Sequence, residues 1–368
     1  MTSDLKLVFP RTFRHWCVAG ILACATIWAI SLVFVDDGRF YVWDDTLQMC
    51  VSAPGQVIHW RSEGWGTTHY GKHGVVAIPD VERTPGPKAI IWGDSYVEAL
   101  QVSDEDKMSQ QASTLWRRSH TEPLTFVGIG RAGASTVDYY FHMPKYEKIV
   151  GPIEAHFIVI DDIRDMLPSA EESSNRFLLA SGNRFLSEPD YHLEEREVMP
   201  SGQRVKRWIS VFHMNALISL ARSIVPMIPG MDSKASWRFG LGPVDHPPSR
   251  ETEPITGPCS AAFSYFLSAF KKIEKAPIIF VFLPCVPSIK EGAITFLDPG
   301  SQPVELFADE CKKQGFAFIN MQDAFIRLFK ETGRFPRGFS NTEPGVGHMN
   351  KYGHKVVAEA LCRYMGTQ

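Results

Sequence analysis

Short apolar runs alternate with longer amphipathic stretches from residue 88 onward, and this alternation constrains the fold more than any other feature of the sequence. Five of the runs are brief and rich in β-branched or aromatic residues, as β-strands are; they cover residues 88–92, 124–127, 156–160, 277–284 and 316–321. Strands that alternate with helices form a parallel sheet with helices on both faces. The sequence therefore predicts an α/β fold, a three-layer α/β/α sandwich around a five-stranded, mostly parallel sheet.

The stretches next to these strands have the periodicity of helices that bury one face. The expected helices include residues 97–116, 135–149, 261–275 and 351–364. In the third of them the apolar residues fall on one side, namely Phe263, Phe266, Leu267, Phe270 and Ile273. We expect that side to pack on the sheet.

The N-terminal region contains an uncharged apolar run over residues 16–35, twenty residues long. A helix of this length matches a hydrocarbon core of roughly 30 Å. Basic residues precede the run and acidic residues follow it: Lys6, Arg11 and Arg14, then Asp36 and Asp37. The positive-inside tendency predicts a single-pass anchor in the cell inner membrane, with a cytoplasmic N-terminus and a periplasmic or extracellular remainder. The alternatives are a cleaved signal peptide and a lipoprotein signal ending at Cys24.

These features divide the chain into parts. Residues 1–15 form the cytoplasmic N-terminus and 16–35 the transmembrane anchor. We expect 36–87, which has little periodicity, to be an approach segment packed on the edge of a domain that covers 88–368. Residues 167–258 interrupt the alternation as an insert. The insert contains a basic amphipathic helix, which either packs on the domain or serves as a lid or membrane-surface contact.

Composition and spacing exclude several classes of function. The chain has 38 basic and 41 acidic residues, and it contains no nucleic-acid-binding motif, so we expect no nucleic-acid partner. No two cysteines have the Cys-x-x-Cys spacing. His69 and His73 are four residues apart, but Gly71 lies between them and the glutamate of the zinc-binding H-E-x-x-H motif is absent. We therefore expect no metal and no organic cofactor.

Residues with catalytic chemistry follow the expected strands directly. Ser95 comes after the first strand, in Gly-Asp-Ser; Gly133 comes after the second and Asp161 after the third; His348 precedes the last helix. In sheets of this type ligands bind beyond the carboxyl ends of the strands. A serine nucleophile needs a base for its proton and donors for the oxyanion. The sequence thus predicts that these groups meet on one rim of the sheet.

The segments "GDSY", "VGIGRAGAST", "VIDDIRDM" and "GHMNKYGH" together resemble the SGNH, or GDSL-type, hydrolase family, from about residue 88 to 365 without the insert. The resemblance implies that Ser95 is the nucleophile and that His348 is its base. It also implies an oxyanion hole formed by the backbone N–H groups of Ser95 and Gly133, with Asp161 at the third position. The longer stretch "GDSYVEALQVSDEDK" is similar to the membrane-anchored bacterial branch, whose members often handle acyl groups on cell-surface polysaccharides.

The sequence departs from the family pattern at two positions. Asp161 stands where the family has asparagine, and Gly345 stands where the family has the aspartate three residues before the histidine. The nearest acid is Glu343, so His348 is oriented by Glu343, by a backbone carbonyl, or by nothing. We interpret His354, at the start of the last helix, as structural.

The resulting hypothesis is a membrane-anchored, extracytoplasmic serine acyl esterase or O-acyltransferase acting on acyl groups, chiefly acetyl, of a cell-surface polysaccharide or glycan. Its partners would be an acylated glycan or other ester and, for a transferase, a membrane-bound acyltransferase that supplies the acyl group. Trp60 and Trp65 either stack on a sugar ring or are buried against the sheet. The alternative is a non-catalytic carbohydrate-binding or polysaccharide-assembly protein on a degenerate domain of this type.

Overall fold

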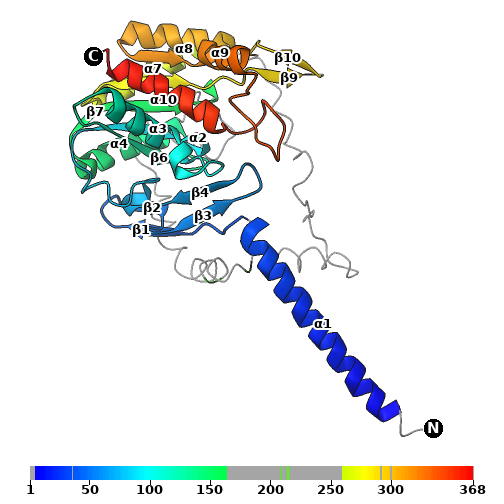
Figure 1. Cartoon of the computed structure of the whole chain (residues 1–368). Coiled ribbons are helices and arrows are strands. Elements are labelled where there is room, and N and C mark those ends of the chain that lie inside the picture. Colours follow the sequence, from blue (N-terminus) through cyan, green and yellow to red (C-terminus); the bar gives the residue numbers. More distant parts are fainter. Residues whose placement is uncertain are drawn as a thin grey trace.

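The computed structural model of the chain describes residues 5–34, 36–163, 208, 214, 259–290, 292–298 and 301–367 (Figure 1). The amphipathic helix expected within the insert therefore lies outside the described residues, apart from Trp208 and Met214.

A five-stranded parallel sheet forms the centre of the fold, as the alternation predicted. Its strands are β5 (Lys88–Gly93), β6 (Thr125–Gly130), β7 (Ile153–Ile160), β8 (Ile278–Phe282) and β11 (Ala317–Asn320). They lie side by side in the order β11-β8-β7-β5-β6, and every neighbouring pair is parallel. The carboxyl ends of all the strands consequently share one rim.

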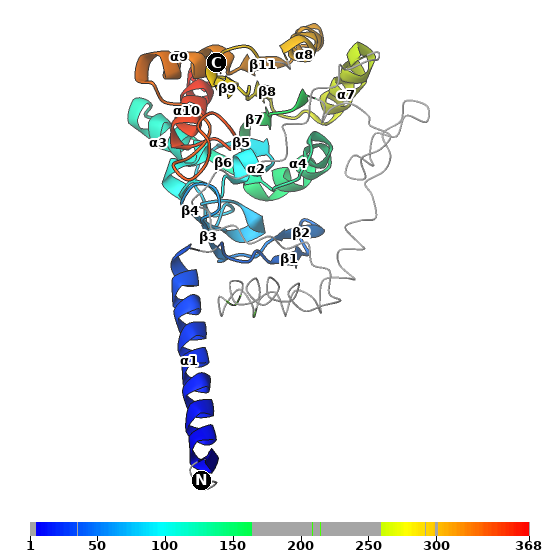
Figure 2. The same ribbon diagram turned by 90° about the vertical axis from the view of Figure 1, so that its right-hand side faces the viewer.

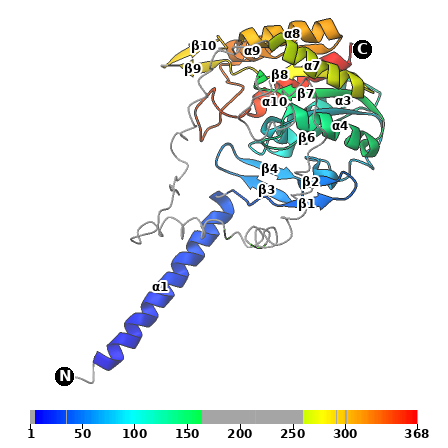
Figure 3. The same ribbon diagram turned by 180° about the vertical axis from the view of Figure 1, so that it is seen from behind.

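Helices cover both faces of this sheet, which gives the three layers seen edge-on in Figure 2. One face carries α4 (Thr136–Val150), α7 (Cys259–Ile273) and α8 (Ser301–Gln314), as Figure 3 shows from behind. The other face carries α3 (Met108–Ser119), α9 (Gln322–Thr332) and α10 (Lys351–Met365). The predicted apolar side of α7 packs as expected, because Phe263, Phe266, Leu267 and Phe270 are all buried in the first of the two cores.

The helix expected over residues 97–116 is interrupted. A short helix, α2 (Ser95–Glu98), ends at Ala99, whose φ is 51°, and a 3-10 turn, η2 (Asp104–Asp106), precedes α3. The buried ammonium of Lys107 donates to the carbonyl oxygens of Glu98 at 2.9 Å and Val102 at 3.2 Å, and also to that of Ala99. This tertiary contact takes carbonyl groups that a continuous helix would use internally, so the chain turns here instead.

Residues 36–87 form a layer of small hairpins beside the sheet (Figure 1). Strands β1 (Tyr41–Asp44) and β2 (Met49–Ser52) pair antiparallel, as do β3 (Val57–Trp60) and β4 (Gly66–His69), and a 3-10 turn, η1 (Lys72–Gly74), follows. Leu47, Met49 and Val51 are buried in the core under α4. A third hairpin, β9 (Ser288–Lys290) with β10 (Ala293–Thr295), lies after β8.

The N-terminal helix α1 (Leu5–Phe34) projects away from the rest of the chain (Figures 1 and 3). Within Thr12–Phe34 the most apolar 18-residue window has a mean hydropathy of 2.3, and 6% of that window is buried. By length and composition this helix could cross a membrane, although a signal sequence passes the same test.

Candidate active site

Ser95 lies on the rim, where β5 passes into α2. Asp94 caps α2, and its carboxylate accepts a hydrogen bond from the backbone N–H of Tyr96 at 2.9 Å. The sharp turn from β5 into α2 requires two glycines, because α2 packs directly against both of them. A Cβ on Gly93 would approach a Val97 methyl carbon to 2.2 Å, and one on Gly130 would approach the Glu98 nitrogen to 2.0 Å. Side chains at these two positions would push α2, and Ser95 with it, off the strand ends.

The structure brings His348 onto Ser95, as the sequence predicted. Nε2 of the imidazole is 2.9 Å from Oγ of Ser95. His348 lies in the loop before α10, and Asn350 stabilises this loop: its side-chain amide donates to the carbonyl oxygens of Phe335 at 2.8 Å and Gly338 at 2.9 Å. The ring of Tyr96 packs on the imidazole at a centroid distance of 5.1 Å. The hydrogen-bonding distance between Ser95 and His348 suits proton transfer from the hydroxyl to the ring.

The other ring nitrogen of His348 contacts an acid that sequence analysis missed. Nδ1 is 2.5 Å from Oε2 of Glu63, and Oε1 of Glu63 accepts a hydrogen bond from the His348 backbone N–H at 2.7 Å. The carboxylate therefore holds both the ring and the backbone of the histidine. Glu63 lies in the β3–β4 turn, 285 residues away along the chain.

Glu343 does not hold the place that the sequence suggested for it; its side chain is exposed, and Nδ1 of His348 is taken by Glu63. The reason lies in the tight turn before the histidine. Gly345 has a φ of +80°, and a Cβ there would approach the Phe335 ring to 2.9 Å. An aspartate could not be placed at this position without strain. The acid consequently comes from another part of the fold.

The turn that carries Glu63 is fixed from two sides. The side chain of Asn341 accepts from the Gly64 N–H at 2.9 Å and donates to the Arg61 carbonyl oxygen at 2.9 Å. On the other side the Asp36 carboxylate accepts hydrogen bonds from the backbone N–H groups of Arg61 and Ser62. The Glu63 carboxylate is thus presented to His348 by a restrained loop rather than by a free one.

Gly133 lies in the turn that follows β6, on the same rim, with a φ of +80°. This turn begins next to the serine, because the Arg131 N–H donates to the Gly93 carbonyl oxygen at 3.2 Å. Buried Glu98 holds the middle of the turn: Oε2 accepts from the Ala132 N–H at 3.1 Å. The same carboxylate accepts from Arg39 at 3.0 Å and from the Tyr70 hydroxyl at 2.5 Å. The last residue of the serine helix therefore positions the turn that carries Gly133.

Asp161 follows β7, is half-buried, and lies among groups of both charges. Burial and the negative charge of nearby Asp94 raise the pKa of Asp161 to about 7, Asp162 adds to the shift, and Arg337 opposes it. Burial also raises the pKa of Asp94. A neutral Asp161 carries an O–H that can donate a hydrogen bond, as an asparagine amide can.

Arg337 is the buried cation of this region. Its guanidinium donates to the carbonyl oxygens of Leu283 at 2.8 Å and Pro284 at 3.1 Å, and also to the Tyr96 hydroxyl. The guanidinium carbon lies 4.7 Å from the centre of the Tyr96 ring. Arg337 thus joins the end of β8 to the residue after Ser95, and its positive charge opposes the rise in the pKa of Asp161.

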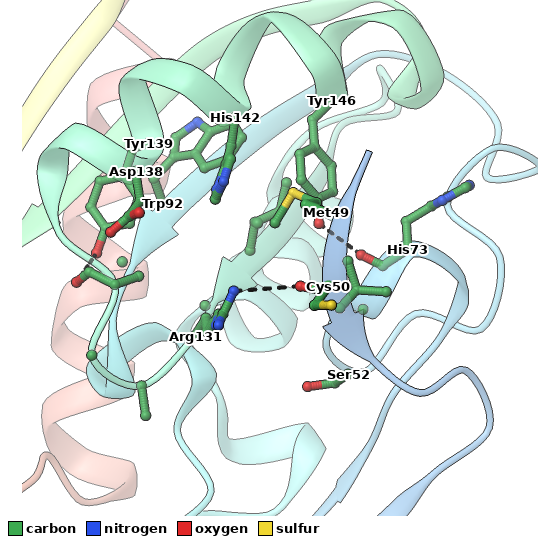
Figure 4. Close-up of a pocket in the computed structure, with 18 residues that line it drawn as sticks. Met49, Cys50, Ser52, His73, Trp92, Arg131, Asp138, Tyr139, His142 and Tyr146 are labelled. Atoms are coloured by element: carbon green, nitrogen blue, oxygen red, sulfur yellow. Dashed lines mark hydrogen bonds between the residues drawn. The ribbon is translucent and has the colours of Figure 1, made fainter. Parts of the chain in front are cut away.

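A cavity of about 300 Å³ lies beside Gly133, between α4 and the β1–β2 hairpin (Figure 4). Its walls are mainly apolar and aromatic, with Met49, Trp92 and Tyr146 among them. Arg131 extends across it to the Cys50 carbonyl oxygen at 3.4 Å, and the Tyr146 hydroxyl donates to the His73 carbonyl oxygen at 2.7 Å (Figure 4). Neither Ser95 nor His348 lines this cavity. Gly93 and Gly133 are among its lining residues, and Gly93 is two residues from Ser95.

The other histidines that the sequence singles out are buried or contact a carboxylate. His354 is buried in α10, and burial lowers its pKa to about 3. His69 and His73 each contact a carboxylate, Asp104 at 2.8 Å and Asp44 at 2.6 Å respectively. Within the described ranges no three His, Cys, Asp or Glu side chains gather as a metal site would require. Trp60 is half-buried, whereas Trp65 is exposed.

Comparisons with known proteins give fold-level similarities alone. No family model matches the sequence, and no curated protein matches it. Among solved structures, LAE5, an α/β-hydrolase enzyme from a lake metagenome, has 12% identity and a TM-score of 0.39 over 78% of this chain and 98% of its own. A variant of Axe2, an acetyl xylan esterase from Geobacillus stearothermophilus, has 13% identity and a TM-score of 0.37 over 77% and 97%. A lipolytic G-D-S-L family member from Veillonella parvula has 11% identity and a TM-score of 0.38 over 76% and 97%.

Proposed function

We propose that the protein is an SGNH-type serine acyl esterase or O-acyltransferase. The observation that carries this proposal is the continuous contact from Oγ of Ser95 through both nitrogens of His348 to Glu63, with distances of 2.9 and 2.5 Å. A nucleophile, a base and an orienting acid in this sequence of contacts form the arrangement that activates a serine. A non-catalytic binding domain would not require these three side chains to lie within hydrogen-bonding distance of one another.

In the proposed reaction Ser95 Oγ attacks the carbonyl carbon of an ester, and its proton passes to Nε2 of His348. The tetrahedral intermediate then collapses; the bond to the leaving oxygen breaks, and that oxygen takes the proton from Nε2 and departs as an alcohol. Water or a sugar hydroxyl next attacks the acyl carbon and gives its proton to Nε2. When the bond to Oγ breaks, Ser95 regains this proton. Throughout, Glu63 holds Nδ1–H, so that Nε2 is the nitrogen that accepts protons.

The negative charge that develops on the carbonyl oxygen must be stabilised by hydrogen-bond donors. We propose the backbone N–H groups of Ser95 and Gly133, together with the protonated carboxyl of Asp161. Such donors contribute most where water is excluded and where their positions are fixed beforehand. The contact between Glu98 and the Ala132 N–H fixes the Gly133 turn, and burial keeps Asp161 neutral below a pH of about 7.

We further propose that α1 is a single-pass anchor in the inner membrane, with the N-terminus in the cytoplasm and the domain formed by residues 88–368 in the periplasm or outside the cell. The charges that flank the apolar run support this orientation. The substrate would be an acetylated cell-surface glycan. If the acyl-enzyme transfers its acyl group to a sugar, a membrane-bound acyltransferase would supply that group.

A fluorophosphonate probe, which reacts with activated serines, tests the proposal. The full-length protein in detergent should be labelled, and labelling should disappear in Ser95→Ala and His348→Ala. The same protein should release acetate from an acetylated sugar. A folded protein that neither reacts with the probe nor releases acetate would refute the proposal and favour a non-catalytic, carbohydrate-binding role.

A further inference from the structure

The β3–β4 turn, residues 61–65, contacts the last turn of α1. Nε of Arg61 donates to the Val33 carbonyl oxygen at 3.2 Å, where the helix has no internal donor. The Trp65 ring packs edge-on against Phe34, with ring centroids 5.9 Å apart. Arg61 in turn lies over the Trp65 ring at 4.5 Å. An arginine and a tryptophan of one turn therefore hold the end of the apolar helix.

The residues that follow α1 reinforce this attachment. Asp36 accepts hydrogen bonds from the backbone of the β3–β4 turn, as described above. Asp37 accepts from the His59 N–H at 2.8 Å and contacts Nδ1 of His59 at 2.7 Å. Asp36 and Asp37, the second and third residues after the end of α1, thus both bind the β3–β4 hairpin.

The same turn carries Glu63, the acid on His348. Consecutive Cα atoms are about 3.8 Å apart, so the Cα of Glu63 is within about 8 Å of those of Arg61 and Trp65. The proposed catalytic acid therefore lies between two residues, Arg61 and Trp65, that contact the end of the apolar helix. Figure 1 shows this arrangement: the β3–β4 hairpin reaches over the end of α1, and the loop that precedes α10 lies beyond it.

The length of the apolar segment places its end at the membrane surface. The 23 residues of Thr12–Phe34 would span ~35 Å as a helix, slightly more than a hydrocarbon core of ~30 Å. Phe34 and Trp65 are 62% and 54% exposed, and aromatic side chains concentrate at the membrane–water interface. Val42 on β1 and Val57 on β3 are also exposed, on the hairpins beside which α1 emerges (Figure 1).

We propose that the active site takes its ester from the bilayer surface: the substrate is the acyl ester of a membrane-embedded amphiphile, such as a glycan carried on a lipid, rather than a polymer remote from the membrane. This inference rests on the proposed esterase function. An anchor that ends beside Glu63 confines the site to the layer in which the head group of such a substrate lies. That confinement raises the effective concentration of the membrane-bound ester without any additional contact.

The test compares two acetylated glucosides that differ in the aglycone alone, methyl and hexadecyl. The full-length protein is reconstituted in phosphatidylcholine vesicles, and acetate release is measured from each at equal total concentration. We expect the hexadecyl ester to react about tenfold faster or more, because it is concentrated in the bilayer. A helical spacer, EAAAKEAAAK, inserted after Val35 would raise the domain by ~15 Å. It should bring the two rates close together and leave the methyl ester rate unchanged.

The matched control is the same spacer inserted after Lys6, before the apolar segment, which should preserve the preference for the hexadecyl ester. The methyl ester rate shows that each variant is folded and active. If the two esters react equally, or if the preference survives the spacer after Val35, the inference is overturned and the esterase function stands. If no variant hydrolyses either ester and Ser95 is not labelled, the proposed function fails, and the inference fails with it.

Discussion

Replacing Glu63 by glutamine should remove most of the activity while leaving the fold intact. The substitution changes one oxygen to an amide nitrogen and leaves the shape of the side chain unchanged. In the parent both carboxylate oxygens accept hydrogen bonds from His348, one from the backbone N–H at 2.7 Å and one from Nδ1 at 2.5 Å. Glu63→Gln has a single oxygen for these two donors, so one of them must face an NH₂ group.

Both orientations of the amide are unfavourable. If the oxygen stays on the backbone N–H, the NH₂ group points at Nδ1, and the imidazole must carry its proton on Nε2. That proton then faces Ser95, and the ring can no longer accept the hydroxyl proton. If the oxygen stays on Nδ1–H, two donors oppose each other at the His348 backbone. An acid-to-amide change in a serine triad lowers kcat roughly 10⁴-fold, or about 5 kcal/mol in the activation barrier. We expect a loss of this order.

The assay measures kcat for 4-nitrophenyl acetate and the rate of fluorophosphonate labelling, with circular dichroism as the check on folding. Glu343→Gln is the matched control, because it makes the same chemical change in an exposed acid close to His348 in the sequence. We expect its kcat to stay within about twofold of the parent, as for most surface changes. A folded Glu63→Gln protein with at least a tenth of the parental kcat, or a large loss in Glu343→Gln, would refute the assignment of Glu63.

Three further outcomes are expected. His348→Ala should abolish probe labelling, whereas His354→Ala removes a buried side chain and should mainly lower the melting temperature; equal loss of labelling in both folded variants would contradict their assigned roles. Glu98→Leu should lower kcat roughly 10²-fold, as loss of one oxyanion donor does, with little change in KM, whereas Glu98→Gln can still accept from the Ala132 N–H and should retain most of the activity. Asp161→Asn should abolish a decline in kcat/KM that the parent shows above a pH of about 7, measured on the same acetyl ester.

The fold could be predicted because its determinants are local. The five strands and the helices between them are visible as periodic apolar patterns, and such patterns fix which face of each element is buried. The interrupted helix after Ser95 could not be predicted in this way. Nothing in the local sequence shows that Lys107 is buried and that its ammonium donates to the carbonyl oxygens of Glu98 and Val102.

The site could be predicted in part for the same reason. Ser95 and His348 stand in short motifs at element boundaries, where the chemistry and the local pattern coincide. Glu63 has no such motif: it lies in a hairpin turn of a segment with little periodicity, and its contact with His348 joins residues 285 apart. The sequence does contain one indirect indication of Glu63, namely the absence of an acid at position 345. Glycine at 345 places no carboxylate three residues before His348, and this indicates that the acid comes from another part of the chain.

An aspartate at position 161 is compatible with the proposed catalysis as long as its carboxyl is protonated. An ionised carboxylate at about 4 Å from an oxyanion would repel it by roughly 4 kcal/mol at an effective dielectric constant near 20. Burial and the charge of Asp94 raise the pKa of Asp161, so the carboxyl stays protonated below a pH of about 7 and can donate. Arg337 limits the shift, which leaves the group able to titrate near neutrality.

The sign of the pH effect on stability follows from the same shift. The pKa of Asp161 is higher in the folded protein than in the unfolded chain, so its contribution to stability is complete below the unfolded value and is lost as the pH rises towards 7. Asp161→Asn has no charge to bury, and it should therefore raise the melting temperature more at pH 8 than at pH 5. This measurement is independent of turnover. If Asp161→Asn were inactive at every pH and yet more stable at pH 8, the carboxyl would be buried and neutral as argued, but its role would be other than that of an oxyanion donor.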